Sequence, residues 1–214
     1  MLADQLKSFG GFEICAGLLA AYGLGCLTTG YYLVRLRAGQ DIRRLGSGSV
    51  GARNVGRVLG RSGFFITLAG DFGKGALAVW AMRHFCSSDG LAVLALVAVS
   101  LGHIWPLQLR FHGGKGVATS LGGLLLLDWR LAAAYTVFFA LLFAAVRRST
   151  LPGLAAYAGL PLASYVMNHD LLEALLLAAL GALVLFAHRS NLGNEKLFGE
   201  ARRKGTPEIN QSKL

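Results

Sequence analysis

A glycine- and serine-rich stretch early in the chain carries residue types that bind phosphate. It reads GSGSVGARNVGR over residues 46–57. Glycines let the backbone adopt positive φ and approach a ligand closely, and successive N–H groups in such a loop can form an anion-binding concavity. Ser47, Ser49 and Asn54 add short hydrogen-bonding side chains, and Arg57 adds a planar guanidinium suited to phosphate. The alternative is a solvated loop whose arginines serve only membrane topology.

A second stretch combines GHIWP at residues 102–106 with FHGGKGVAT at residues 111–119. Its lysine is followed by glycine, so the G-x-x-x-x-G-K-[ST] loop of nucleotide-binding proteins is not present. A glycine-rich turn that leads into a helix still presents free N–H groups at the positive end of the helix dipole, where Lys115 would add a charge. His103 lies near the end of an apolar segment, either as a functional group or as a packed, interfacial histidine.

Two further polar features are weaker on their own. HRSNL at residues 188–192, followed by Gly199 and Glu200, ends the last apolar segment, and its value comes from sharing a membrane face with the other stretches. Asp71 and Lys74 lie three residues apart inside an apolar segment, where charges are costly unless they are paired or functional. This spacing favours a structural ion pair on one helix face.

The elements that must position these residues are membrane helices. The chain is 54% hydrophobic and 15% charged, whereas soluble domains average about 25% charged residues. Roughly 20 apolar residues cross the hydrocarbon, and backbone in lipid must satisfy its own hydrogen bonds, so the long apolar blocks are predicted to be helices. We expect an all-α, polytopic membrane protein with about seven transmembrane helices, or six if the short or broken element near 116–128 does not cross. The predicted spans lie near 12–34, 62–84, 91–109, 116–128, 130–147, 151–168 and 171–188.

The basic residues fall mostly on one side of this arrangement. Of the 21 Lys and Arg residues, 17 lie in the segments 35–61, 110–115, 147–150 and 189–214. The positive-inside rule assigns that side to the cytoplasm. Topology and attraction to anionic lipids explain much of this charge without any site. No nucleic-acid partner is expected, because no recognisable binding module accompanies the charge.

The domain organisation is predicted to be simple. Residues 1–200 form a single transmembrane domain, and the polar residues 201–214 form a disordered cytoplasmic tail. No cleavable signal peptide is evident, and the three cysteines show neither a disulfide framework nor the spacing of zinc ligands. His84 and Asp89 match the H-x-x-x-x-D pattern of another acyltransferase class. The charge distribution places them away from every glycine-rich stretch, so we reject them as a catalytic motif.

Taken together, these residues resemble the bacterial acyl-phosphate:glycerol-3-phosphate acyltransferase family (PlsY). Family members are characterised by a first loop like GSGNVGATN-x-x-R, a second like GH-x-x-P followed by FKGGKGVAT, and a third like H-x-x-N before G-x-E. The chain has GSGSVGARNVGR, GHIWP with FHGGKGVAT, and HRSN with GE, and its residues 71–75 look like the family's D-F-x-K-G segment. It departs at Ser49, Arg53 and His112, where the family usually has Asn, Thr and Lys. Altered substrate preference or reduced activity is therefore one expectation.

The resemblance implies transfer of a fatty acyl group from acyl-phosphate to the 1-hydroxyl of glycerol 3-phosphate, which gives lysophosphatidic acid and phosphate. The donor is already activated, so neither coenzyme A nor a metal or other cofactor is needed, and the protein supplies positioning and electrostatic stabilisation. Its partners would be membrane lipids and a soluble enzyme that produces acyl-phosphate. It would lie in the bacterial cytoplasmic (inner) membrane, with the active site facing the cytoplasm.

The resemblance also divides the candidate residues into three sets. Acyl-phosphate is assigned to Ser47, Gly48, Ser49, Gly51 and Asn54. Glycerol 3-phosphate is assigned to Arg57, Lys115, His188 and Asn191. Catalysis is assigned to His103, Lys115, Gly113 and Gly114. In this scheme His103 is a candidate base, with a substrate phosphate oxygen as the alternative. N–H groups near the two glycines would hold a developing oxyanion.

Two other interpretations remain open at this point. A membrane transporter or lipid-handling protein would use the same basic face for head groups, but it would be expected to place polar residues near the membrane midplane, often with repeated broken helices. A catalytically impaired relative of the acyltransferases would keep the fold and lose the reaction.

Overall fold

The structure is a computed structural model that describes residues 10–86, 88–147 and 149–189. This part of the chain is helical and contains no strand, which confirms the all-α prediction. The α-helices are α2 (Gly11–Cys26), α3 (Thr29–Ala38), α4 (Ala52–Cys86), α5 (Asp89–Ile104), α6 (Val117–Leu127), α7 (Trp129–Val146), α8 (Thr150–Asn168) and α9 (Leu171–Ala187). Two short 3-10 helices, η1 (Ile42–Arg44) and η2 (Leu107–Leu109), lie in the connections. The predicted tail at 201–214 lies outside the described residues.

The helices occupy the predicted spans. Among the described residues, four stretches are long and apolar enough to cross a membrane: Gly11–Ala38, Ala52–Cys86, Asp89–Leu109 and Trp129–Val146. The eleven residues of α6 extend about 16 Å at 1.5 Å per residue, roughly half of the hydrocarbon thickness of about 30 Å. The prediction of a short element near 116–128 is therefore confirmed.

The first predicted span is divided into two helices. α2 ends at Cys26 and α3 begins at Thr29. At this break the carbonyls of Gly25 and Leu27 accept hydrogen bonds from the Nζ of Lys74, at 3.1 and 3.0 Å. A membrane helix can open in this way only where another group satisfies its backbone, and here a buried ammonium does so.

The second span begins earlier than the predicted residue 62. α4 starts at Ala52, but Gly60 has φ 73° and ψ −165°, a conformation suited to glycine. It separates residues 52–59, here called the pre-kink helix, from the membrane-crossing part of α4. The kink allows the last residues of the first glycine-rich stretch to be helical while they remain outside the membrane span.

Glycines let the helices cross at close range. A Cβ on Gly75 of α4 would lie 1.8 Å from the Thr119 carbonyl oxygen of α6, and one on Gly122 would lie 1.9 Å from the Phe72 carbonyl oxygen. The α2–α5 crossing depends in the same way on Gly102. Small residues are typical of membrane helix interfaces because they allow the backbones to approach.

The apolar residues divide into an outer surface and two cores. Large side chains that are exposed on the helices include Phe12, Leu19, Phe65, Trp80, Leu141 and Leu162, as expected for surfaces that face lipid. The main core is formed by residues from α2 and α4 through α9. A second, small core of Val34, Ile42, Val50 and Val55 packs beneath the first glycine-rich loop. The loop is thus supported by its own apolar cluster.

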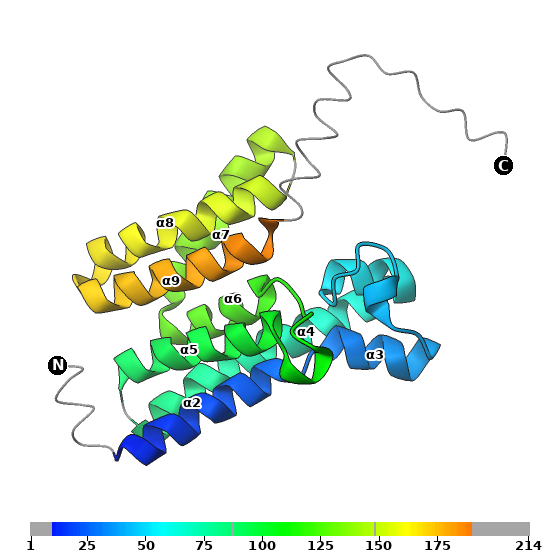
Figure 1. The fold of residues 1–214 in the computed structure, drawn as a ribbon. Coiled ribbons are helices and arrows are strands. Elements are labelled where there is room, and N and C mark those ends of the chain that lie inside the picture. The colour runs from blue at the N-terminus through cyan, green and yellow to red at the C-terminus, as the bar shows by residue number, and fades with distance from the viewer. Residues whose placement is uncertain (1–9, 87, 148, 190–214) are drawn as a thin grey trace, which may run out of the picture.

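The connections that carry the predicted site residues lie together at one end of the bundle. Figure 1 shows the α3–α4, α5–α6 and α7–α8 connections and the end of α9 at this end, with the α4–α5, α6–α7 and α8–α9 connections at the other. The alternating direction of the helices therefore brings the three predicted stretches to one face. His84 and Asp89 lie beside the α4–α5 connection at the opposite end, in agreement with their rejection.

Replacing Gly75 with alanine should lower the melting temperature of the detergent-purified protein, because the added methyl group overpacks the α4–α6 crossing at a cost of about 1–3 kcal/mol. Gly73→Ala is the matched control, since no atom lies within 4 Å of a Cβ at that position. Equal melting temperatures for the two variants would contradict the close crossing.

Candidate active site

Asn54 organises the first glycine-rich loop. Only 2% of its surface is exposed. Its Oδ1 accepts a hydrogen bond from the Ser47 N–H at 2.9 Å, and its Nδ2 donates to the carbonyls of Leu45 and Ser49, each at 2.9 Å. Both ends of the amide are therefore used within the loop. Asn54 shapes this loop and has little capacity left to contact a substrate directly.

The other predicted loop residues lie in the turn that Asn54 holds. Gly46 and Gly48 have φ of 55° and 72°, which other residues rarely adopt. A Cβ on Gly46 would also lie 2.3 Å from the Asn54 Oδ1. The Ser49 Oγ accepts a hydrogen bond from the Gly51 N–H at 3.3 Å. The sequence-predicted set is therefore one compact turn.

Arg43 joins the first loop to the second. Its Nη2 lies 2.6 Å from the Asp41 Oδ2, and its Nη1 donates to the Leu109 carbonyl in η2 at 2.9 Å. The side-chain hydrogen bonds from Arg43 hold the pKa of Asp41 below its ordinary value. The guanidinium also lies 5.2 Å from the centre of the Tyr31 ring. These contacts of Arg43 were not predicted, because in the sequence it is only one of many basic residues that set membrane topology.

The second loop folds back on the end of α5. The Gly113 N–H donates to the Ile104 carbonyl at 3.1 Å, and the Gly114 N–H donates to the His103 carbonyl at 2.9 Å. Helix ends leave carbonyls without intrahelical partners, and these two bonds satisfy two of them. The structure thus corrects the expectation that these two N–H groups are free to hold an oxyanion.

His103 is buried in an ionic cluster. It is 3% exposed, and its Nδ1 lies 2.8 Å from the Nζ of Lys74, which in turn lies 3.0 Å from the Asp71 Oδ1. The predicted pairing of Asp71 with Lys74 is therefore confirmed. Because an ammonium only donates, the Nδ1 of His103 accepts and its Nε2 carries the proton.

The protonated side of His103 faces the second loop. A Cβ on Gly114 would lie 2.0 Å from its Nε2, so only glycine fits there. With this tautomer His103 has no free lone pair for a substrate proton, so the geometry favours the alternative base, a substrate phosphate oxygen. The His103 side chain instead sets the position of the glycine pair.

The start of α6 keeps its N–H groups free of side-chain caps. Gly116, with φ 83°, precedes the first residue of α6, and no side chain caps this end. The Ser120 Oγ donates to the Gly116 carbonyl at 2.7 Å and lies 2.5 Å from the Tyr157 hydroxyl of α8. These two contacts hold the turn at Gly116 in place. An uncapped helix start favours anions through its free donors and its dipole.

Lys115 supplies a positive charge to the site, and His188 lies close enough to be affected by it. Burial lowers the pKa of Lys115, and the charge of Arg53 lowers it further. Burial also lowers the pKa of His188; the hydrogen bond between its Nδ1 and the Val184 carbonyl, 2.8 Å long, opposes this effect, and the charge of Lys115 adds to it. The charge of Arg53 therefore acts on Lys115, and that of Lys115 acts on His188, which indicates that the three groups lie near one another.

Two other residues predicted to bind glycerol 3-phosphate are Arg57 and Asn191. Arg57 lies exposed on the pre-kink helix. Asn191 lies outside the described residues. Within the described ranges, no cluster of three or more His, Cys, Asp or Glu side chains could hold a metal ion.

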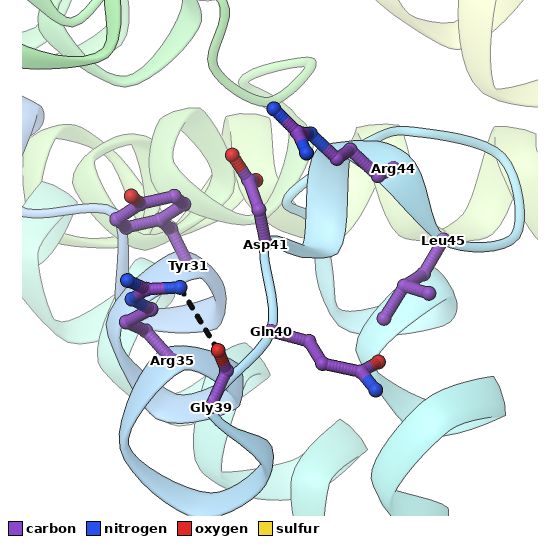
Figure 2. A pocket seen from close by; sticks show the side chains of 7 residues that line it. All are labelled: Tyr31, Arg35, Gly39, Gln40, Asp41, Arg44 and Leu45. Carbon is purple, nitrogen blue, oxygen red and sulfur yellow. Dashed lines mark hydrogen bonds between the residues drawn. The ribbon is translucent and has the colours of Figure 1, made fainter.

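Two cavities border η1. The cavity that joins the two loops has a volume of about 360 Å³ and is lined by Asp41, Arg43, Arg44, Gly48, His112 and Gly113. The larger one, of about 630 Å³, lies between α3 and η1 and is lined by Tyr31, Arg35, Gly39, Gln40, Asp41, Arg44 and Leu45 (Figure 2). None of the sequence-predicted site residues lines the larger cavity. The candidate site therefore lies on the side of the smaller one, between the two glycine-rich loops.

This geometry defines a polytopic membrane protein whose glycine-rich loops lie together at one face. The profile of the family described as Glycerol-3-phosphate acyltransferase matches residues 15–196. The chain is 49% identical over 175 residues to glycerol-3-phosphate acyltransferase 1 of Desulfitobacterium hafniense (strain Y51), covering 82% of this chain and 87% of that protein. It is 42% identical over 174 residues to the glycerol-3-phosphate acyltransferase of Jannaschia sp. (strain CCS1), covering 81% and 85%.

Solved structures show the same relationship. The chain matches the crystal structure of PlsY (YgiH), an integral membrane glycerol 3-phosphate acyltransferase, in its glycerol 3-phosphate form, with a TM-score of 0.79 and 31% identity over 87% of this chain and 93% of that chain. The lysophosphatidic acid form matches with a TM-score of 0.76 and 29% identity over the same shares. The chain belongs to the glycerol-3-phosphate acyltransferase family, which confirms the resemblance seen in its motifs, and it is an integral membrane protein.

Asn54→Ala should destabilise the protein by about 1–3 kcal/mol, because it leaves the Ser47 N–H and two loop carbonyls without the partner that this buried side chain provides. It should also raise the KM for acyl-phosphate, since the loop loses its shape. Both effects can be measured on the purified protein, by thermal unfolding and steady-state kinetics.

Ser47→Ala is the control for stability, because the partner of Asn54 is the backbone N–H of this exposed residue and the variant keeps it. A melting temperature for Asn54→Ala equal to that of the wild type would contradict the organising role.

Proposed function

We propose that this chain transfers a fatty acyl group from acyl-phosphate to the 1-hydroxyl of glycerol 3-phosphate and releases lysophosphatidic acid and phosphate. The observation that carries this proposal is that the two glycine-rich loops meet at one cavity. Gly48 of the first loop and Gly113 of the second both line it. Each substrate carries one phosphate, so two such elements are what the reaction requires.

The two elements fit the two substrates differently. The turn held by Asn54 suits acyl-phosphate, because its core packs against α3, which exposes Leu36 as an apolar surface for an acyl chain. The start of α6, with Lys115 and His188, suits the phosphate of glycerol 3-phosphate, as fixed positive charge and free N–H groups favour a dianion. Arg57 and Asn191 are assigned to the same phosphate.

The reaction in this site is a direct transfer. The 1-hydroxyl oxygen attacks the acyl carbonyl carbon, the bond between that carbon and the phosphate oxygen breaks, and the phosphate leaves with the bonding electrons. The hydroxyl proton passes to a phosphate oxygen of the substrate. His103 does not serve as the base in this scheme, because its Nδ1 accepts from Lys74 and its Nε2 is protonated. The protein accelerates the step by holding both phosphates and stabilising the charge that develops.

The cellular setting follows from the same proposal. The segments that contain 17 of the 21 Lys and Arg residues are predicted to lie at the face that carries the loops, and the positive-inside rule assigns this face to the cytoplasm. The protein would lie in the bacterial inner membrane, take glycerol 3-phosphate from the cytoplasm, and receive acyl-phosphate from a soluble enzyme that produces it.

A transporter function is less well supported. It would place its binding groups near the membrane midplane between repeated broken helices. The charged residues within the α4 span, Asp71 and Lys74, instead pair with each other, and Lys74 contacts His103 beside the second loop.

The purified protein should release phosphate from a synthetic acyl-phosphate only when glycerol 3-phosphate is present. Lys115→Ala should lower kcat/KM by about 100-fold or more, the loss typical of removing one group that stabilises developing charge. Arg110→Ala, which changes an exposed cation of the same loop, should retain wild-type kinetics. Absence of phosphate release by the wild type would favour an impaired relative or a transporter, and full acyl transfer by Lys115→Ala would overturn the assignment of the anion site.

A further inference from the structure

Arg53 links two parts of the molecule that are distant in the chain. It lies in the first turn of the pre-kink helix, and its Nη1 donates to the Ser149 Oγ at 2.6 Å. Ser149 directly precedes α8, 96 positions later. The contact therefore joins the first glycine-rich loop to the α7–α8 connection at the end of the bundle that carries the candidate site.

Arg53 also adds to an unusual concentration of positive charge. Arg57 follows it at i+4 on the same helix, and like charges at this spacing repel each other. Both sit near a helix N-terminus, where the dipole disfavours cations. Burial lowers the pKa of Lys115 and the charge of Arg53 lowers it further, so Arg53 lies near enough to act on the second loop. Among the described residues none of these three cations has a carboxylate partner, whereas Arg43, Lys74, Arg83 and Arg130 each pair with an aspartate.

Such a cluster is stabilised when an anion binds between its members. Building on the proposed function, we infer that Arg53 is an additional ligand of the glycerol 3-phosphate phosphate group, held over the subsite by Ser149. A guanidinium has five N–H donors, and the Ser149 hydroxyl occupies one, so the others are available to phosphate oxygens. Ser149 is then a positioning residue that keeps the long side chain of Arg53 from extending into solvent.

The coupling of charges decides which phosphate Arg53 contacts. Lys115 is affected by Arg53, and His188 is affected by Lys115. Both Lys115 and His188 belong to the proposed glycerol 3-phosphate subsite, whereas the acyl-phosphate turn is held separately by Asn54. The usual threonine of the family motif cannot supply a charge at this position. The arginine therefore gives this chain one more cation for a dianionic acyl acceptor.

The test uses the full-length protein in detergent and compares Arg53→Thr, Arg53→Lys and Ser149→Ala. Arg53→Thr should raise the KM for glycerol 3-phosphate about tenfold, the loss expected for one charge-assisted hydrogen bond. The KM for acyl-phosphate and the kcat should stay at wild-type values. Arg53→Lys should recover part of the loss, and Ser149→Ala should raise the same KM by about two- to threefold, because it removes only the support.

Arg37→Thr is the matched control, since it removes an exposed arginine from the same face of the protein, on α3. An unchanged KM for glycerol 3-phosphate in Arg53→Thr, an increase confined to acyl-phosphate, or an equal effect of Arg37→Thr would each overturn the inference. Melting temperatures establish that the variants are folded. Calorimetric binding of glycerol 3-phosphate separates this test from the proposed reaction, because Arg53→Thr should weaken binding even if the wild type shows no acyl transfer.

Discussion

A buried ammonium group holds the active end of this molecule together. The side chain of Lys74 is surrounded by four acceptors, which are the Asp71 carboxylate, the carbonyls of Gly25 and Leu27, and the Nδ1 of His103. A charge inside a membrane span is costly unless it is paired in this way. The arrangement fixes the break between α2 and α3, the register of α4 against α5, and the orientation of the His103 ring at the same time.

The position of the catalytic loops follows from that cluster. The protonated Nε2 of His103 packs against Gly114, and the carbonyls at the end of α5 accept the N–H groups of the glycine pair. These contacts fix the loop directly before Gly116. The first N–H groups of α6 have no side-chain cap, and Lys115 lies two residues before the helix begins. Polar groups that look catalytic in the sequence thus divide into two kinds: those satisfied within the protein, which set geometry, and those left free for phosphate.

Much of the fold could be predicted from the sequence because hydropathy and charge act locally. The apolar blocks predicted the spans to within a few residues, the short length of 116–128 predicted α6, and the distribution of basic residues predicted which connections gather at one face. The kink at Gly60 was not predicted, since an isolated glycine in a helical pattern does not reveal its φ. The division of the first span at Leu27 depends on Lys74, 47 positions away.

The candidate site was predicted in composition but not in detail. The residue types of the loops identified phosphate chemistry, and the family match agrees with it. The hydrogen-bond partners of His103, Gly113 and Gly114 could not be predicted, because they are set only when α4, α5 and the second loop pack together. The contacts of Arg43 with Leu109 and of Arg53 with Ser149 join residues 66 and 96 positions apart, and no local pattern marks them.

The central claim is that His103 positions the second loop and takes no proton from the substrate. The pH dependence of kcat/KM for His103→Asn tests it most directly, because the asparagine Oδ1 can accept from Lys74 where the Nδ1 did, while the side chain cannot titrate. The account predicts a folded variant whose profile has the same shape as that of the wild type, with a rate reduced by no more than a few fold. A loss of about 10²–10⁴-fold in a folded variant, accompanied by the disappearance of one limb of the profile, would show that His103 is the general base and would contradict the account.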